Sequence, residues 1–465
     1  MKKFWVLFPL IFCLSCATYY QRHLKFNSYF EQGKLKEADD ILASDKKAEK
    51  RKDKLLYYLN RGTVHSMLGN YDQSNAFFES AHRMAETHRK NVLNEGVSFL
   101  TNSNFSEYEA EDFEHFLINY YKALNYLKQG NTEAALVEAK RMNIVLSEVE
   151  TKYSNPDKFQ KDAFVHLLMG LIYDANKDYN NAFIAYRNSL EIYQKEYKTM
   201  FGLEAPEQLK KDILRTAALS GFMEDVSFFE RTFNMKYTAE KAGSPELVFF
   251  WHSGLGPVKS EWSINFNIIR GQGGNVMFVN EQMGLSFPFP ITDDNYNSSG
   301  LSKVEFVRVA FPKYIERTPL YTNAEITVGG KSFSLEKTED INAIAFKSLK
   351  DRMLLELGKS LLRVGLKKAA EYNLRSQNDG AGAALGLLNA ITEKADTRNW
   401  QSVPHGIYYT RMPLAVGKQE VVFKANGNNV SPNTQTFTFD VKPGEKIFQT
   451  ISTLDMQQGL VPNQY

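Results

Sequence analysis

A glycine pair followed by lysine and serine is the first place where the sequence suggests phosphate chemistry. Gly329-Gly330-Lys331-Ser332 matches the end of a phosphate-binding loop, in which backbone N–H groups and the lysine hold the phosphates. Such a loop needs another glycine at position 325, where Glu325 stands, and a helix after the serine. The residues after Ser332 instead alternate as in a strand. We therefore predict a hairpin turn here and no bound nucleotide.

A second polar stretch has the alternation of a calcium-binding loop. Asp293, Asn295 and Asn297 are spaced like its first ligands. Ser298 stands where that loop requires glycine, and Val304 stands where its last acidic ligand belongs. We interpret the stretch as a polar turn and predict no metal site.

The remaining candidates for catalysis are scattered. The eight histidines include no HExxH motif and no pair at metal-ligand spacing, and no GxSxG motif is present. Glu111, Asp112 and Glu114 cluster beside His115, but acids at the start of a helix stabilise its N-terminal dipole without doing chemistry. The sequence predicts no catalytic residue, no cofactor, no metal and no enzymatic activity.

One residue near the N-terminus is suited to covalent modification. Lys2 and Lys3 precede an apolar run from Phe4 to Leu14, which is shorter than the ~20 residues of a membrane-spanning helix and is typical of a signal peptide. Ser15 directly before Cys16 resembles a bacterial lipobox. We expect residues 1–15 to be removed and Cys16 to carry lipid. The alternative is an ordinary signal peptide with a spare thiol.

The composition limits the partners and the architecture. The 465 residues are enough for about three domains, and a net charge of +2 does not favour nucleic acid as a partner. Beyond Cys16 there is no cysteine, which excludes disulfides and thiolate metal sites from the body of the protein.

The first half contains repeats of a helix-turn-helix unit. In residues 59–81, Gly62, Gly69, Tyr71, Phe78 and Ala81 have the spacing of a tetratricopeptide repeat, in which a small residue lets two helices approach. Further copies place turns at positions 33, 130, 177 and 221. Residues 16–240 are therefore expected to form a tetratricopeptide-like α-solenoid, with an ordinary helical bundle as the alternative.

The first helices of such pairs line a concave groove. By register the groove is apolar, because its predicted lining residues are Leu117, Tyr120, Leu124, Leu127, Phe164, Leu167 and Leu171. An apolar groove of this size is rarely left open to water. Either a protein partner binds there or the chain's own C-terminal half covers it. Asn60 is the clear remnant of the pattern that grips a peptide carboxylate in some repeats of this type.

The second half reads mainly as strands, so we predict an α+β multidomain protein. Residues 245–340 form the first part of a β-rich domain, residues 341–400 a helical insertion, and residues 401–455 strands of a small Ig-like or PEGA-like β-sandwich. Small apolar residues run from Gly380 to Ile391. They indicate either a hairpin that touches the membrane, or close helix packing or a mobile loop.

Six stretches resemble a family of bacterial outer-membrane lipoproteins that contain tetratricopeptide repeats and have no assigned activity. They are CATYY at Cys16, LLYYLNRGTVHSMLGNYDQSNAFFE, DFEHFLINYYKALNYL, ALVEAKRMN, ELVFFWHSGLGPVK and ADTRNWQSVPHGIYYTRMPL. Genes of this family often neighbour lipoprotein activators of penicillin-binding proteins. The resemblance carries over no catalytic residues.

Together these patterns predict a lipid-anchored scaffold on the periplasmic face of the outer membrane. The side of the membrane follows from Ala17 after Cys16, by resemblance to lipoprotein sorting signals. Its expected work is to bind other envelope proteins, such as those activators, in envelope assembly or in regulation of peptidoglycan synthesis. The alternative is a peptidoglycan-binding or other glycan-binding module with weak hydrolase activity.

Overall fold

The computed structural model describes residues 18–94, 106–152, 158–239, 244–270, 275–290, 305–377 and 394–457. The expected signal peptide, Cys16, the 293–297 turn and the Gly380–Ile391 segment therefore lie outside the described residues. Among the described helices, none is both long enough and apolar enough to cross a membrane.

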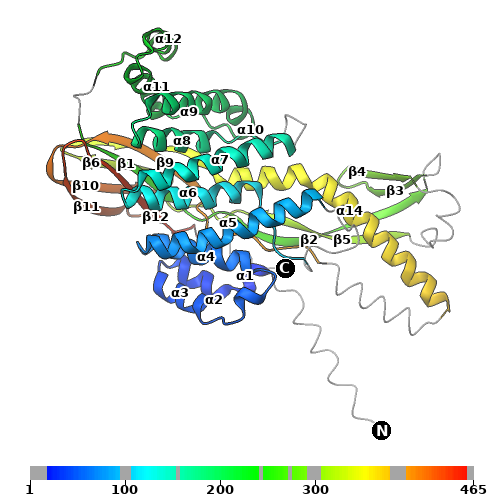
Figure 1. Ribbon diagram of the computed structural model, residues 1–465. Helices are drawn as coiled ribbons and strands as arrows, with labels where there is room; N and C mark the ends of the chain where they lie inside the picture. Colours follow the sequence, from blue (N-terminus) through cyan, green and yellow to red (C-terminus); the bar gives the residue numbers. More distant parts are fainter. Residues whose placement is uncertain are drawn as a thin grey trace.

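Paired helices make up the first half (Figure 1). In the described residues, the short helix α1 (Tyr19–Arg22) precedes five helix pairs. The pairs are α2 (Leu24–Glu31) with α3 (Leu35–Ala43), α4 (Lys54–Met67) with α5 (Tyr71–Asn94), α6 (Asp112–Lys128) with α7 (Thr132–Lys152), α8 (Ala163–Ala175) with α9 (Tyr179–Ile192), and α11 (Glu207–Leu219) with α12 (Met223–Phe233). Short helical segments occur at Ala48–Lys50 (η2), Tyr193–Tyr197 (η4) and Lys198–Phe201 (α10).

The turn inside every pair has a residue in the left-handed region. The φ angles are 71° at Gly33, 78° at Gly69, 73° at Gly130, 60° at Lys177 and 77° at Gly221. Glycine adopts this conformation without steric cost, and Lys177 adopts it although it has a Cβ. The five turn positions predicted from the sequence are thereby confirmed.

Close packing inside the pairs also agrees with the repeat pattern. A Cβ added to Gly62 on α4 would lie 2.8 Å from the Phe78 ring on α5, and one added to Gly170 on α8 would collide with the Tyr186 ring on α9. Ser74 stands where the repeat usually has alanine, and its hydroxyl donates to the Gly62 carbonyl at 2.7 Å. The N-terminal half therefore has tetratricopeptide-like helix pairs.

The strands form three four-stranded sheets, which we name the inner, outer and distal sheets. The inner sheet has the order β12 (Lys446–Thr453), β1 (Glu246–Ser253), β9 (Gly406–Pro413) and β8 (Glu336–Asp340). The outer sheet has the order β11 (Asn433–Val441), β10 (Gly417–Asn426), β6 (Asn323–Val328) and β7 (Lys331–Ser334). The distal sheet has the order β4 (Leu285–Pro290), β3 (Asn275–Asn280), β2 (Val258–Arg270) and β5 (Phe306–Ile315).

Strand β1 lies at the centre of the body because both of its faces are covered. Leu247, Phe249 and Trp251 pack with residues of the outer sheet, whereas Val248 and Phe250 belong to the core shared with the helices. Successive side chains of a strand point to opposite faces, so this alternation places helices, inner sheet and outer sheet in three layers. It also explains why the sequence of β1 reads as a nearly continuous apolar run.

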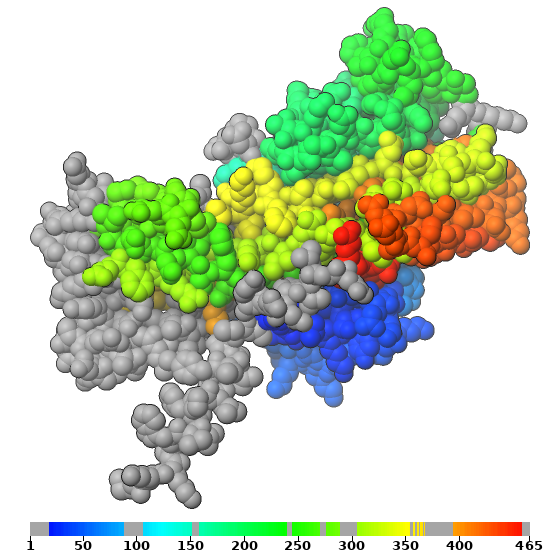
Figure 2. Space-filling view, turned by 180° about the vertical axis from the view of Figure 1, so that it is seen from behind, coloured from blue at the N-terminus to red at the C-terminus, as the bar shows by residue number. Residues whose placement is uncertain are grey.

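The C-terminal strands do not form a separate unit, which corrects the expected division of the second half. Strand β1 pairs with β9 in antiparallel and with β12 in parallel orientation, and β10 pairs with β6. From behind, the orange strands of the outer sheet lie against the yellow-green β6 and β7 (Figure 2). Residues 245–340 and 401–455 therefore build the same two sheets, and neither sheet comes from residues 401–455 alone.

The long helix α14 (Ile341–Gln377) occupies most of the expected helical insertion. It packs on β5, and its Leu357, Leu361 and Val364 are buried in the core that includes Val309 of β5. The distal sheet and α14 extend together away from the helix pairs (Figure 1). Residues 394–400 form neither helix nor strand, which shortens the expected insertion.

Candidate functional site

The chain itself covers the predicted groove. All seven groove residues are at most 3% exposed, and they share one core with residues of the inner sheet. The Tyr120 ring lies 5.2 Å from the Phe164 ring and 6.2 Å from the Phe250 ring of β1, between ring centroids. This corrects the interpretation of the groove as an open protein-binding site. The physical reason is that the apolar face of the inner sheet removes the same surface from water that a partner would.

A polar contact lies within this apolar interface. The Tyr120 hydroxyl and Nε2 of His252 are 2.6 Å apart and hydrogen-bonded, and both side chains are buried. Burial, with a smaller effect from Lys128, lowers the pKa of His252 to about 3. The imidazole is therefore neutral at physiological pH, and the contact aligns α6 with β1 without burying a charge.

A buried ion cluster joins the last helix pairs to the inner sheet. Arg411 Nη1 lies 2.6 Å from Asp174 and 3.0 Å from Asp212, while its Nη2 lies 2.6 Å from Glu246. Three carboxylates and three cations take part: Asp174, Asp212, Glu246, Arg215, Arg411 and Lys446. Burial acts to raise the pKa of Asp174, but Arg411, Arg215 and Lys446 outweigh it and hold the pKa well below its usual range. One side of the cluster lines a cavity of about 300 Å³.

The acids expected at a helix start form a second buried cluster. Glu111 and Glu114 lie at the start of α6, as expected, and they form a capping box there. Glu111 also accepts hydrogen bonds at 2.7 Å from Lys259 of β2 and from Arg352 of α14. Burial would raise the pKa of Glu111, but the charges of Arg352 and Lys259 lower it to about 2. Glu114 accepts from the Trp400 backbone N–H at 3.0 Å, so the cluster joins α6 to three distant segments.

The glycine pair and the histidines considered in the sequence analysis lie in contacts that stabilise the fold. Gly329 and Gly330 have positive φ and form the two-residue turn between β6 and β7, which confirms the hairpin. Nε2 of His405 lies 2.8 Å from a Glu316 carboxylate oxygen, and burial followed by the Lys161 charge lowers the pKa of His166 to about 4. In the part of the chain that the structure describes, no group of three or more His, Cys, Asp or Glu residues is placed to hold a metal ion.

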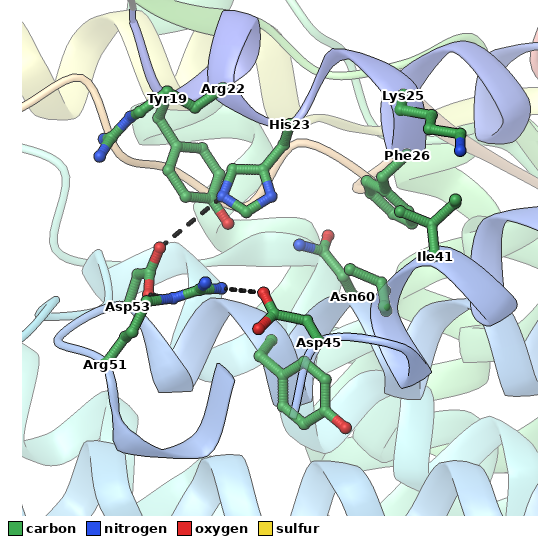
Figure 3. A pocket seen from close by; sticks show the side chains of 12 residues that line it. Tyr19, Arg22, His23, Lys25, Phe26, Ile41, Asp45, Arg51, Asp53 and Asn60 are labelled. Carbon is green, nitrogen blue, oxygen red and sulfur yellow. Dashed lines mark hydrogen bonds and ion pairs between the residues drawn. The ribbon is translucent and has the colours of Figure 1, made fainter. Parts of the chain in front are cut away.

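A cavity of about 310 Å³, which we name the N-terminal cavity, opens at the first helix pairs (Figure 3). Helices α1 to α4 and the segment between α3 and α4 supply its walls. The residues that line it are Tyr19, Arg22, His23, Lys25, Phe26, Ile41, Leu42, Asp45, Arg51, Asp53, Tyr57 and Asn60.

The charged groups on one side of the cavity are joined in a chain. Arg51 lies 2.6 Å from Asp45 and 3.2 Å from Asp53, and Asp53 lies 3.7 Å from Nε2 of His23. Burial would raise the pKa of Asp53, but the hydrogen bond from His23 and the Arg51 charge lower it to about 2. Arg22 and Lys25 lie at the rim and are exposed.

Two buried side chains turn polar groups toward the same space. Tyr19 and Asn60 are 3% and 2% exposed. The Asn60 amide oxygen accepts from Ser402 Oγ at 2.8 Å, while its amide nitrogen points into the cavity (Figure 3). The Tyr19 hydroxyl points toward the space between Asp53 and Asn60. Within the described residues, neither the amide nitrogen nor this hydroxyl has a hydrogen-bond partner.

Sequence reasoning identified Asn60 but missed the rest of this cavity. Its walls come from four helices and a connecting segment, and no local period relates them. The available signal was the pair Tyr19 and His23, which lie four residues apart and whose rings are 4.3 Å apart between centroids.

Comparisons with known proteins give partial likenesses. No family model matches the chain, and no curated protein matches its sequence. The apo form of RapI is similar over 46% of this chain and 52% of its own, with 16% identity and a TM-score of 0.33. MamA 41-end from Desulfovibrio magneticus RS-1 is similar over 45% of this chain and 87% of its own, with 16% identity and a TM-score of 0.29. BtubC (BKLC) from P. vanneervenii is similar over 46% of this chain and 81% of its own, with 11% identity and a TM-score of 0.32. The matched part thus spans about half the length of RapI, and no family membership follows from these likenesses.

Proposed function

We propose that the protein is a scaffold that binds other proteins, held by lipid on Cys16 at the periplasmic face of the outer membrane. The observation that carries the scaffold role is the joining of tetratricopeptide-like helix pairs to two sheets through buried contacts. The Arg411 cluster connects α8 and α11 to the inner sheet, and the Glu111 cluster connects α6 to β2 and α14. Such a body presents several separate surfaces in fixed relative positions, which is what a scaffold requires.

The surfaces available to partners are those that the inner sheet leaves uncovered. Large apolar side chains are exposed on the second helices of three pairs, including Ile144 on α7, Ile184 on α9 and Met223 on α12. Single exposed apolar residues are common on protein surfaces, so they mark accessible positions without identifying a partner. An envelope role, including contact with activators of penicillin-binding proteins, is supported by the lipobox-like Cys16 and by the family resemblance.

The test is site-specific photo-crosslinking in intact cells. A photoreactive phenylalanine analogue is placed at Ile144, Ile184 or Met223, and at Phe306 on the distal sheet for comparison. Exposed sites spare the fold, and a scaffold is expected to give discrete crosslinks to the same proteins before and after muramidase digestion. A chain that crosslinks to no protein from any position would contradict the proposal.

One observation, the N-terminal cavity, favours the alternative function of glycan binding. Glycan binding requires no protein partner. It predicts that the chain is retained on the cell-wall fraction and that muramidase digestion abolishes this retention. The two functions are therefore distinguished by the same digestion.

A further inference from the structure

The N-terminal cavity contains hydrogen-bonding groups that the fold does not use. Polar groups inside proteins are normally hydrogen-bonded, and a group that faces an open cavity can bond either water or a ligand there. Tyr19 and Asn60 are more than nine-tenths buried, yet both direct a polar group into the cavity (Figure 3). The cavity volume of about 310 Å³ lies at the lower end of the ~300–1,000 Å³ range of small-molecule sites.

The charge arrangement indicates a neutral ligand. Arg51 is engaged by Asp45 and Asp53, and His23 by Asp53. An anion would have to compete with two carboxylates for Arg51, and a cation would have to compete with Arg51 for the carboxylates. The cationic Arg22 and Lys25 are exposed at the rim, where water solvates them. The charged side chains of the inner wall are therefore paired with one another, and they lie beside two uncharged polar groups, on Tyr19 and Asn60, that have no partner among the described residues.

The remaining wall is aromatic and aliphatic. Rings of Tyr19, His23, Phe26 and Tyr57 line the cavity together with Ile41 and Leu42, and they supply apolar surface beside the polar groups. A ligand that fits both must carry several groups that donate and accept hydrogen bonds, and must also have an apolar face. Sugar hydroxyls donate and accept at once, and the C–H face of a sugar ring packs on aromatic rings.

We propose that the N-terminal cavity is a binding site for one neutral sugar unit. The Tyr19 hydroxyl and the Asn60 amide nitrogen bind ligand hydroxyls or an acetamido carbonyl, and the aromatic rings contact the ring face. This proposal rests on the glycan-binding alternative, for which it names a site and a ligand class, and its failure leaves the photo-crosslinking prediction of the scaffold role untouched.

The first experiment measures binding to the full chain, purified in a detergent without a sugar headgroup. The probes are glucose, galactose and N-acetylglucosamine, with sodium acetate and inorganic phosphate as charged comparisons. Saturation-transfer-difference NMR reports sugar protons close to protein protons, and calorimetric titration gives the affinity. At least one neutral sugar is expected to bind saturably.

The variants assign the binding to this cavity. Tyr19→Phe removes only the unpartnered hydroxyl and is expected to weaken sugar binding about threefold to tenfold, the worth of one neutral hydrogen bond. The matched control is Tyr179→Phe on α9, which lies outside the cavity and is expected to bind as the unmodified chain does. Ile41→Trp places a large ring in the cavity from α3 while leaving its polar residues unchanged, and it is expected to abolish binding.

Melting temperatures decide how each variant is interpreted. Tyr19→Phe is expected to melt at the temperature of the unmodified chain. If it melts lower, its loss of binding could come from unfolding, and the binding result of Ile41→Trp alone tests the sugar site. The proposal is wrong if no neutral sugar binds, or if the deciding variants bind sugar with unchanged affinity. It is also wrong if acetate or phosphate, and no sugar, binds in a manner that depends on these residues.

Discussion

Tyr120 on α6 and His252 on β1 are 132 positions apart in the chain, yet their side chains hydrogen-bond at 2.6 Å inside the core. The contact fixes where the first helices of the pairs meet the inner sheet. The predicted groove residues are buried in the core that the helices share with the inner sheet, so their substitution acts on folding.

Leu124→Asp is therefore expected to destabilise the protein. Leu124 is 2% exposed in the core that α6 shares with the inner sheet, so a carboxylate there would be buried among apolar side chains. The expected loss is about 3 kcal/mol or more of unfolding free energy. Denaturant unfolding measures it, with Val137→Asp on the exposed face of α7 as the control. Equal stability of both variants would show that the inner sheet does not cover this position in solution.

Arg411→Met is expected to be strongly destabilising as well. It leaves Asp174, Asp212 and Glu246 with only Arg215 and Lys446 to balance them. Removing one member of a buried ion pair typically costs about 3–5 kcal/mol, because the remaining charge is buried and uncompensated. Thermal melting checks this, and Lys195→Met, which breaks the exposed pair with Glu191, should leave the melting temperature unchanged. A small effect at Arg411 would mean that water enters the cluster.

Asp162→Asn tests a buried carboxyl whose pKa is raised. Burial raises the pKa of Asp162 from 3.8 to about 6, so ionisation above that pH opposes folding. The cost is absent below about pH 4, grows as the pH rises through this interval and is complete above about pH 6. Asparagine keeps the acceptor for the Val165 N–H and cannot ionise. We expect the variant to be about 1–3 kcal/mol more stable at pH 7.5 and nearly unchanged at pH 4.

Chemical denaturation at the two pH values measures this difference. Asp178→Asn is the matched control, because Asp178 caps α9 in the same way but lies nearer the surface. A variant at Asp162 that lost stability equally at both pH values would contradict the buried ionisation.

Cys16→Ser tests the proposed anchor. Without the thiol no lipid can be attached, and the chain is expected in the soluble fraction of cells after a high-pH wash. Fractionation followed by immunoblotting measures the distribution, and Cys13→Ser, three residues earlier, is the control that should stay with the membrane. A Cys16→Ser chain that remained with the membrane would contradict the lipid anchor, and the Gly380–Ile391 segment would then be the candidate for membrane contact.

Local features of the fold were predictable from the sequence, and long-range ones were not. The turn at Gly69 and the contact of Gly62 with Phe78 depend on residues within one helix pair, so spacing alone predicts them. The pairing of β1 with β12 joins residues 200 positions apart. Both strands have apolar residues suited to several neighbours, so their patterns predict strands without predicting which strands pair.

The candidate site was predicted less well for the same reason. Asn60 was noticed because it belongs to a known helical pattern, whereas its position in one cavity with Tyr19 depends on contacts between distant segments. Tyr19 is positioned by its backbone N–H, which donates to Thr397 at 2.9 Å, a contact across 378 positions. No local period contains that information.

The position of β1 between β9 and β12 has a consequence for the order of assembly. The chain emerges from its N-terminus, so the helix pairs and β1 are available long before β12, which ends at Thr453. Until that strand arrives, one edge of β1 lacks its parallel neighbour and the inner sheet that covers α6 and α8 is incomplete. Newly made chains therefore pass through a stage in which an apolar surface is open to chaperones, and a chain that stops before residue 446 stays at that stage.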